Sequence, residues 1–203
     1  MIRCHLVHGI LDPVGRSGLL GLIPYLERAG FDVRVPDYGL ITACETKIVN
    51  PLLRRALHPY MEPGDLWIGH SNGCAIGYEL SVGVEELAPV PFAGCVWINP
   101  ALERNRKPLA PCWTDCYYNA GDEATVAAVA AASLGLADSV WGEMGHAGPE
   151  PDPSGLVVGI DCGATPDLPP VSGHGDIFTP AKLAAWAPFI VERIRSRLAM
   201  PAA

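Results

Sequence analysis

The fold of this chain is decided by one stretch, Asp65-Leu66-Trp67-Ile68-Gly69-His70-Ser71-Asn72-Gly73-Cys74-Ala75. Its short apolar run, residues 66–68, predicts a buried strand, and the turn residues Glu62-Pro63-Gly64-Asp65 precede that strand. Small residues follow Ser71, and they would let a helix approach the sheet closely. The stretch therefore predicts a strand, a sharp turn and a helix in succession, with Ser71 at the turn.

Gly69 and Gly73 flank the serine in the pattern G-x-S-x-G, which is typical of a nucleophilic serine carried on a strained strand-to-helix turn. The strand and the helix nearly touch at these two positions, so a side chain would clash there and glycine fits. The pattern is short, and with 22 glycines in 203 residues about 0.1 matches are expected by chance. A glycine-rich turn of any α/β protein is the alternative, so residues elsewhere in the chain must distinguish the two.

Strands and helices are predicted to alternate along the chain. The predicted strands are residues 3–7, 31–36, 66–68, 92–98, 115–120 and 156–160. Helices are predicted at residues 17–29, at 42–60, after Ser71, at 124–133 with Val126 and Val129 on the buried face, and after Thr179; Pro51 and Pro188 should distort two of them. This alternation predicts an α/β fold with about six mainly parallel strands, helices on both faces, and residues 1–203 as a single domain.

Three loops that leave predicted strands carry a serine, an acid and a histidine. Ser71 follows the third strand, Asp122 the fifth and His174 the sixth. Because the carboxyl ends of parallel strands meet at one edge of the sheet, these side chains are expected to converge despite their separation in sequence. A serine activated by a histidine, which an acid orients, is the arrangement that nucleophilic catalysis requires.

Taken together, the chain resembles a small α/β-hydrolase of the lipase/esterase type. The resemblance runs from His8-Gly9 through the serine turn and Asn119-Ala120-Gly121-Asp122 to Gly173-His174-Gly175-Asp176-Ile177-Phe178. It implies Ser71 as nucleophile, His174 as general base and Asp122 as the orienting acid. It also implies that the backbone N–H groups of Ile10 and Asn72 stabilise an oxyanion.

The chain also departs from this family. The two N-terminal strands of the family are missing, and residues 103–114, where a cap domain usually sits, are too few to form one. We therefore expect a trimmed sheet, a minimal lid and an open, shallow site.

Each site residue has a rival. His146 could replace His174 as the base, although His174 is preferred because a strand precedes it and a terminal helix follows it. Asp152 and Asp161 compete with Asp122, and the acid is the least constrained member. His70 is expected to be a packing or access residue, His5 a core or strand-end histidine, and Asp176 a loop or helix-start cap.

The composition of the chain indicates which partners are disfavoured and which cellular compartment is favoured. The net charge of −8 disfavours nucleic acid and anionic membranes as main partners. No apolar run is long enough to span a bilayer, and the N-terminus lacks the pattern of a signal peptide. Seven scattered cysteines agree with free thiols in a reducing cytoplasm, and Cys112 and Cys116 lack a second pair at zinc-ligand spacing. No metal site and no cofactor are expected.

The predicted function is hydrolysis of carboxylic esters of small molecules through an acyl-enzyme on Ser71. A thioesterase, amidase or acyltransferase could use the same three residues, and the sequence does not separate these reactions. A non-catalytic binding module with this fold is the alternative from another class.

Overall fold

The computed structural model describes residues 1–10, 18–36, 38–39, 42–84, 87–109, 111–136 and 139–199. Its single sheet has six strands in the order β2-β1-β3-β4-β5-β6, and every neighbouring pair is parallel. The strands are β1 (Arg3–Val7), β2 (Asp32–Arg34), β3 (Leu66–His70), β4 (Gly94–Ile98), β5 (Trp113–Tyr118) and β6 (Val157–Asp161). The predicted parallel sheet is confirmed, although most strands differ by a few residues from the predicted ranges.

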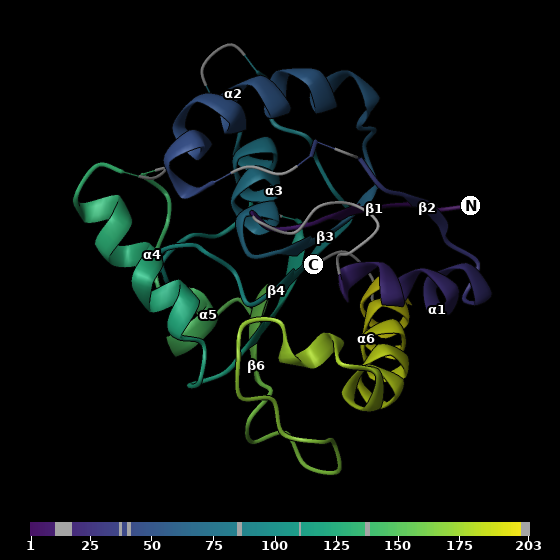
Figure 1. Ribbon diagram of the computed structural model, residues 1–203. Helices are drawn as coiled ribbons and strands as arrows, with labels where there is room; N and C mark the ends of the chain where they lie inside the picture. Colours follow the sequence, from purple (N-terminus) through teal and green to yellow (C-terminus); the bar gives the residue numbers. More distant parts are fainter. Residues whose placement is uncertain are drawn as a thin grey trace.

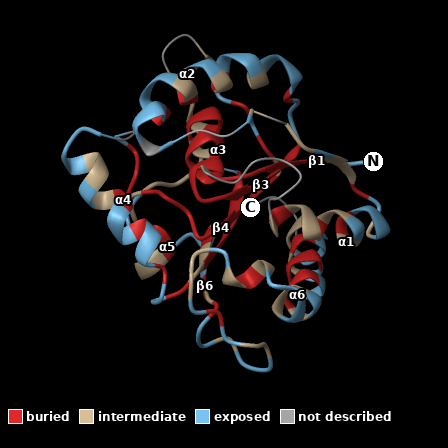
Figure 2. Ribbon diagram, viewed as in Figure 1, coloured by how far each residue is buried: buried red, intermediate tan, exposed pale blue. Residues whose placement is uncertain are grey.

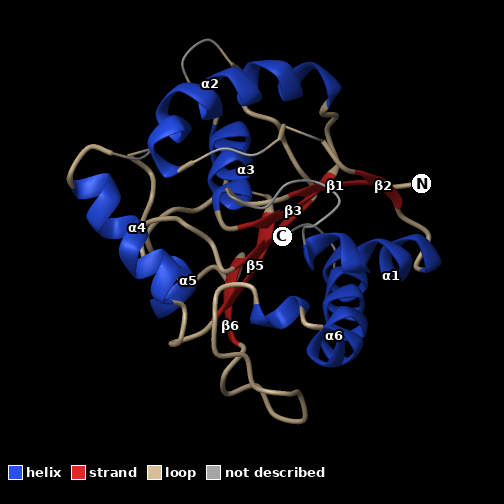
Figure 3. Cartoon of the chain, in the orientation of Figure 1, coloured by secondary structure: helices blue, strands red, loops and turns tan. Residues whose placement is uncertain are grey.

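Helices cover both faces of this sheet (Figures 1 and 3), as predicted. One side carries α1 and α6, and the other carries α2, α3, α4 and α5. The α-helices are α1 (Ile23–Arg28), α2 (Thr46–Leu57), α3 (Asn72–Val82), α4 (Glu123–Ser133), α5 (Met144–Ala147) and α6 (Pro180–Ala199). Short 3₁₀ turns are η1 (Gly18–Leu22), η2 (Ala43–Glu45), η3 (His58–Tyr60) and η4 (Asp176–Phe178).

The central strands are buried on both faces, so alternate residues enter two separate apolar cores. Leu66 and Ile68 of β3 face the core shared with α1 and α6, which includes Trp186. Trp67 faces the opposite core, together with Ile76 of α3. Figure 2 shows α3 buried along most of its length, whereas α2 and α4 expose their outer surfaces. The helix that follows Ser71 is therefore held firmly against the sheet.

The two prolines that were expected to distort predicted helices do not end them. Pro51 and Pro188 lie inside α2 and α6, which continue through them. In α6 the buried residues Trp186 and Ile190 stand on either side of Pro188, so packing on both sides offsets the roughly 3 kcal/mol that an internal proline costs.

The predicted buried face of α4 is wrong. The structure buries Thr125 and Ala128, whereas Val126 is 43% exposed and Val129 is half-buried. Asp122 caps this helix by accepting a hydrogen bond from the backbone N–H of Thr125 (3.2 Å), and this cap fixes which face turns inward. In an alanine-rich helix the apolar residues alone do not specify a face.

Candidate active site

Ser71 lies on the sharp turn between β3 and α3. Its backbone angles are φ 55° and ψ −121°, a conformation that residues other than glycine rarely adopt. The turn is held on both sides, because the N–H of Ser71 donates to the carbonyl of Ile98 (3.1 Å) and the N–H of Cys74 donates to the carbonyl of Ser71 (3.0 Å). Strained backbone of this kind is concentrated at functional sites, where the surrounding structure maintains it.

The glycines on either side of Ser71 are required by space. A Cβ on Gly73 would lie 2.1 Å from the carbonyl oxygen of Val7, and one on Gly69 would lie 2.7 Å from the backbone nitrogen of Cys74. A Cβ on Gly9 would lie 2.8 Å from the Cβ of Ser71 itself. The close approach predicted from the G-x-S-x-G pattern is thus present, and the loop after β1 lies directly against the serine.

We expect Gly73→Ala to lower the free energy of unfolding by about 3 kcal/mol or more, because the new Cβ meets rigid backbone. Gly175→Ala is the matched control, since a Cβ there meets nothing within 4 Å. The control should change stability by less than about 0.5 kcal/mol. Urea unfolding of the three proteins measures both effects, and equal stability of the Gly73 and Gly175 variants would contradict this account of the turn.

Asp122 and His174 are in direct contact. Nδ1 of His174 lies 2.9 Å from both carboxylate oxygens of Asp122, which is fully buried. Burial by itself would raise the pKa of Asp122. Hydrogen bonds from His174, from Nδ2 of Asn99 (2.8 Å) and from the N–H of Thr125 outweigh that effect and hold this pKa below its usual value. Asp122 is therefore a buried carboxylate in direct contact with the imidazole of His174.

The loop that carries His174 is fixed on the loop after β5. Nδ2 of Asn119 donates to the carbonyl of Gly173 (3.3 Å). A Cβ on Gly121 would lie 2.4 Å from the carbonyl oxygen of Ser172, so glycine permits the two loops to touch. Two stretches that the resemblance singled out, residues 119–122 and 173–174, are thus in contact. Asn119 and Gly173 are 54 positions apart in the sequence.

A cavity of about 270 Å³ brings together three of the predicted residues, Ile10, Ser71 and His174. Ser71, which lines this cavity, is 6% exposed. The N–H of Asn72 is the first of α3, so it has no acceptor within the helix. The residues that line the cavity are Ile10, Ser71, Ala101, Ala124, Thr125, Ala128, Trp141 and His174.

The rival residues lie elsewhere. His146 belongs to α5 and is not one of the described residues that line the cavity of Ser71. Asp152 accepts hydrogen bonds from Ser154 and from the N–H of Val157 and forms an ion pair with Lys107.

The other acids that the sequence singled out have structural partners. Asp161, at the end of β6, accepts from the N–H of Gly163 (2.8 Å). Asp176 accepts from Ser172 and Lys182, which agrees with the predicted loop cap. The contacts therefore favour His174 and Asp122 as partners of Ser71, and their roles stay a prediction.

Asn99 was missed altogether from the sequence, and at Asn72 the side chain was missed, although the backbone N–H of that residue had been singled out. Asn99 has φ 46° and directs its amide at Asp122. Asn72 is fully buried, exchanges two side-chain hydrogen bonds with Asn50 (3.0 Å each) and accepts a third from Nε1 of Trp141 (3.0 Å). Asn99 stands directly before a proline at the end of a strand, a signal that marks a turn but not its use.

His70 supports the loop of His174 and does more than pack. Its Nε2–H donates to the carbonyl of His174 (2.9 Å), and its ring lies 4.7 Å from the ring of His174 and 5.0 Å from that of Phe178. Burial, with the neighbouring His174, lowers the pKa of His70 to about 3. Above that pH the folded chain therefore holds His70 as a neutral hydrogen-bond donor.

This pKa predicts a specific loss of stability in acid. In the unfolded chain His70 is exposed and has a pKa near 6.5, whereas in the folded chain its pKa is about 3. Between these two pH values only the unfolded chain binds the proton. Stability is thus lost as the pH falls from 6.5 toward 3. We expect His70→Asn, which cannot titrate there, to reduce the drop in unfolding free energy between pH 7 and pH 5 by about 2 kcal/mol. Urea unfolding at both pH values tests this, and an equal drop in both proteins would contradict it.

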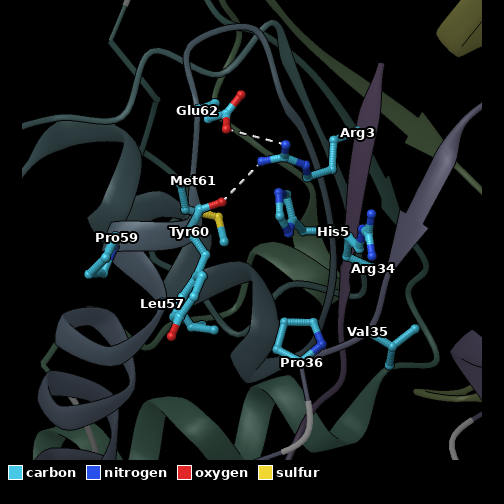
Figure 4. A pocket seen from close by; sticks show the side chains of 10 residues that line it. All are labelled: Arg3, His5, Arg34, Val35, Pro36, Leu57, Pro59, Tyr60, Met61 and Glu62. Carbon is cyan, nitrogen blue, oxygen red and sulfur yellow. Dashed lines mark hydrogen bonds and ion pairs between the residues drawn. The ribbon is translucent and has the colours of Figure 1, made fainter. Parts of the chain in front are cut away.

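A second hollow, of about 560 Å³, lies at the start of β1 and beside η3 (Figure 4). Arg3 donates there to the carbonyl of Tyr60 (3.2 Å) and to Glu62 (3.3 Å), and buried His5 contacts Asp65 (2.8 Å). His5 is thus the satisfied strand histidine that the sequence predicted. The basic side chains that line this hollow have acidic partners, Arg34 with Asp32 among them, and Ser71 and His174 line a different cavity. This hollow is therefore not the candidate catalytic site.

The described residues were expected to hold no metal ion and to form no membrane-spanning helix. Among them no three His, Cys, Asp or Glu side chains are grouped as a metal ion would need. None of their helices is both long and apolar enough to cross a membrane. The compartment of the protein stays a prediction.

Comparison with known proteins shows the fold. No protein-family model and no curated protein sequence matches the chain. A crystal structure of a protein from Xanthomonas campestris pv. campestris, assigned to the alpha/beta hydrolase superfamily, is similar with a TM-score of 0.58 at 16% identity, over 97% of this chain and 99% of that one. The ydeN gene product of B. subtilis is similar with a TM-score of 0.56 at 10% identity, over 98% and 100%. The chain has the α/β-hydrolase fold.

Proposed function

We propose that this protein is a serine hydrolase that cleaves carboxylic esters of small molecules. One observation carries the proposal: Ser71, on a strained turn, shares a cavity with His174, whose Nδ1 is held by the buried carboxylate of Asp122. A nucleophile, a base and a group that orients the base are the parts that acyl transfer by a serine requires. The structural similarity to a protein assigned to a hydrolase superfamily agrees with this proposal.

The reaction follows from the roles of these groups. Oγ of Ser71 attacks the ester carbonyl carbon while Nε2 of His174 accepts the hydroxyl proton. The negative charge that develops on the carbonyl oxygen is stabilised by the N–H groups of Ile10 and Asn72, each worth about 3 kcal/mol. His174 then returns the proton to the leaving alcohol as the C–O bond breaks, and an acyl-enzyme remains on Ser71.

Water completes the cycle. His174 takes a proton from a water molecule, whose oxygen attacks the acyl carbon, and Ser71 leaves with that proton as the acid is released. Asp122 stays ionised throughout and stabilises the imidazolium that forms twice per turnover. The proposed reaction consumes only the ester and water.

A panel of matched substrates tests the proposal. The purified protein would be given p-nitrophenyl butyrate, a butyryl thioester and butyryl p-nitroanilide, and the kcat/KM of each would be measured. We expect the oxygen ester to be hydrolysed with the highest kcat/KM. A higher value for the thioester or anilide would reassign the substrate class, and no turnover of any of them by folded protein would favour a binding module.

A further inference from the structure

Trp141 lines two cavities. The role that we infer for it below rests on the proposed function. The cavity of about 270 Å³ contains Ser71 and His174. A second cavity, of about 590 Å³, is lined by Glu103, Arg104 and the α4 residues Val129, Ala132 and Ser133, among others. Trp141 lines both cavities, whereas Ala128 lines only the first and Ala132 only the second. Trp141 therefore borders both the cavity of the nucleophile and a larger space.

The side chain of Trp141 is held in place. Trp141 is 5% exposed, and its Nε1–H donates to the buried side chain of Asn72 (3.0 Å). The backbone beside it is fixed to residues 102–103, because Glu103 donates to the carbonyl of Val140 (3.0 Å) and Met144 donates to that of Leu102 (2.9 Å). A Cβ on Gly142 would lie 2.5 Å from the Cα of Glu103, so the two segments are packed closely. A bound substrate would not easily displace this side chain.

The space on the serine side is small and mainly apolar. Besides Trp141, its walls include Ile10 and the alanines at 101, 124 and 128, and its volume lies below the roughly 300 Å³ at which pockets for drug-sized ligands begin. Apolar walls of this kind suit a hydrocarbon chain and bind it through burial. The charged and polar groups Glu103, Arg104 and Glu143 line the other cavity.

We propose that Trp141 determines substrate specificity by limiting the acyl group to a short chain, such as acetyl or butyryl. Longer chains are excluded because the indole closes the apolar pocket. Removing the indole joins the two cavities, and the added space accepts a chain such as octanoyl. The substrate class of this site is therefore an ester with a short acyl group.

The direct test is Trp141→Ala with p-nitrophenyl butyrate and octanoate. We expect the ratio of kcat/KM for octanoate to that for butyrate to rise by about tenfold or more, because methylene groups that were excluded become buried. Trp141→Phe is the matched control, since it loses the Nε1–H donor but keeps a ring in the wall. Its ratio should stay near that of the wild type, whereas an equal rise in both variants would overturn the proposal.

A second pair of variants keeps the native wall and does not depend on the folding of Trp141→Ala. Ala128→Leu fills the inner cavity, and Ala132→Leu fills the outer one from the same helix. We expect Ala128→Leu to lower kcat/KM for butyrate relative to acetate by about tenfold and Ala132→Leu to leave that ratio unchanged. Equal effects of the two substitutions would overturn the proposal.

Different results would contradict the role of Trp141 and the proposed function. Wild-type protein that hydrolyses butyrate, with unchanged ratios in folded Trp141→Ala, would contradict only the role of Trp141. Wild-type protein that hydrolyses no ester would contradict the proposed function itself.

Discussion

Ser71→Ala is expected to lower kcat/KM for p-nitrophenyl butyrate by roughly 10⁴- to 10⁶-fold, to the level that binding without a nucleophile leaves. The reason is that the proposed acyl-enzyme forms only on the Oγ of Ser71, which stands on the turn between β3 and α3 and lines the same cavity as His174. Removing one oxygen leaves the turn itself in place, so the loss reflects chemistry. Steady-state hydrolysis with far-UV circular dichroism as the folding check measures it.

Ser196→Ala provides the matched control for this substitution. Ser196 is an exposed residue of α6, on the side of the sheet away from α3, so its replacement should leave kcat/KM unchanged. Folded Ser71→Ala protein with wild-type activity would show that another group is the nucleophile, and the proposed mechanism would be wrong.

His174→Ala is expected to lower kcat/KM by roughly 10⁴-fold or more, because among the described residues His174 is the imidazole hydrogen-bonded to Asp122 and proposed to accept the proton of Ser71. His146→Ala is the matched histidine control. His146 sits in α5 and does not line the cavity, so its variant should keep activity close to that of the wild type. The same ester assay applied to both variants gives the comparison.

Two other outcomes of the histidine comparison would each have a definite meaning. If His146→Ala lost esterase activity and His174→Ala retained it, the protein would still be a hydrolase, but its general base would be His146. Loss in both would require a check of folding, because Gly145 packs against Asp122, where a Cβ would lie 2.7 Å from Oδ2.

Local signals explain why much of the fold was predictable. Gly69, Ser71 and Gly73 specify a close strand-to-helix turn whatever lies around them, and the structure has that turn with φ 55° at the serine. The alternation of strand and helix signals then requires parallel strands, and parallel strands bring distant loops to one edge. For this reason the placement of His174 on Asp122 was predictable although 52 residues separate them.

The remaining features depend on contacts that no local pattern encodes. Trp141 lies in a glycine- and proline-rich segment whose structure the sequence did not predict, and its importance comes from Asn72 and from the two cavities that it borders. The buried pairing of Asn50 with Asn72 joins α2 to α3 across 22 residues. The inward face of α4 follows from its cap on Asp122, and its apolar residues gave the wrong face.

The central claim is that Ser71 is an activated nucleophile, and a fluorophosphonate probe tests it most directly. The purified protein would be treated with the probe, digested, and mapped by mass spectrometry. We predict one covalent adduct, on Ser71, which disappears in His174→Ala and persists in His146→Ala. Folded wild-type protein that acquires no adduct, or acquires it on another residue, would contradict the account.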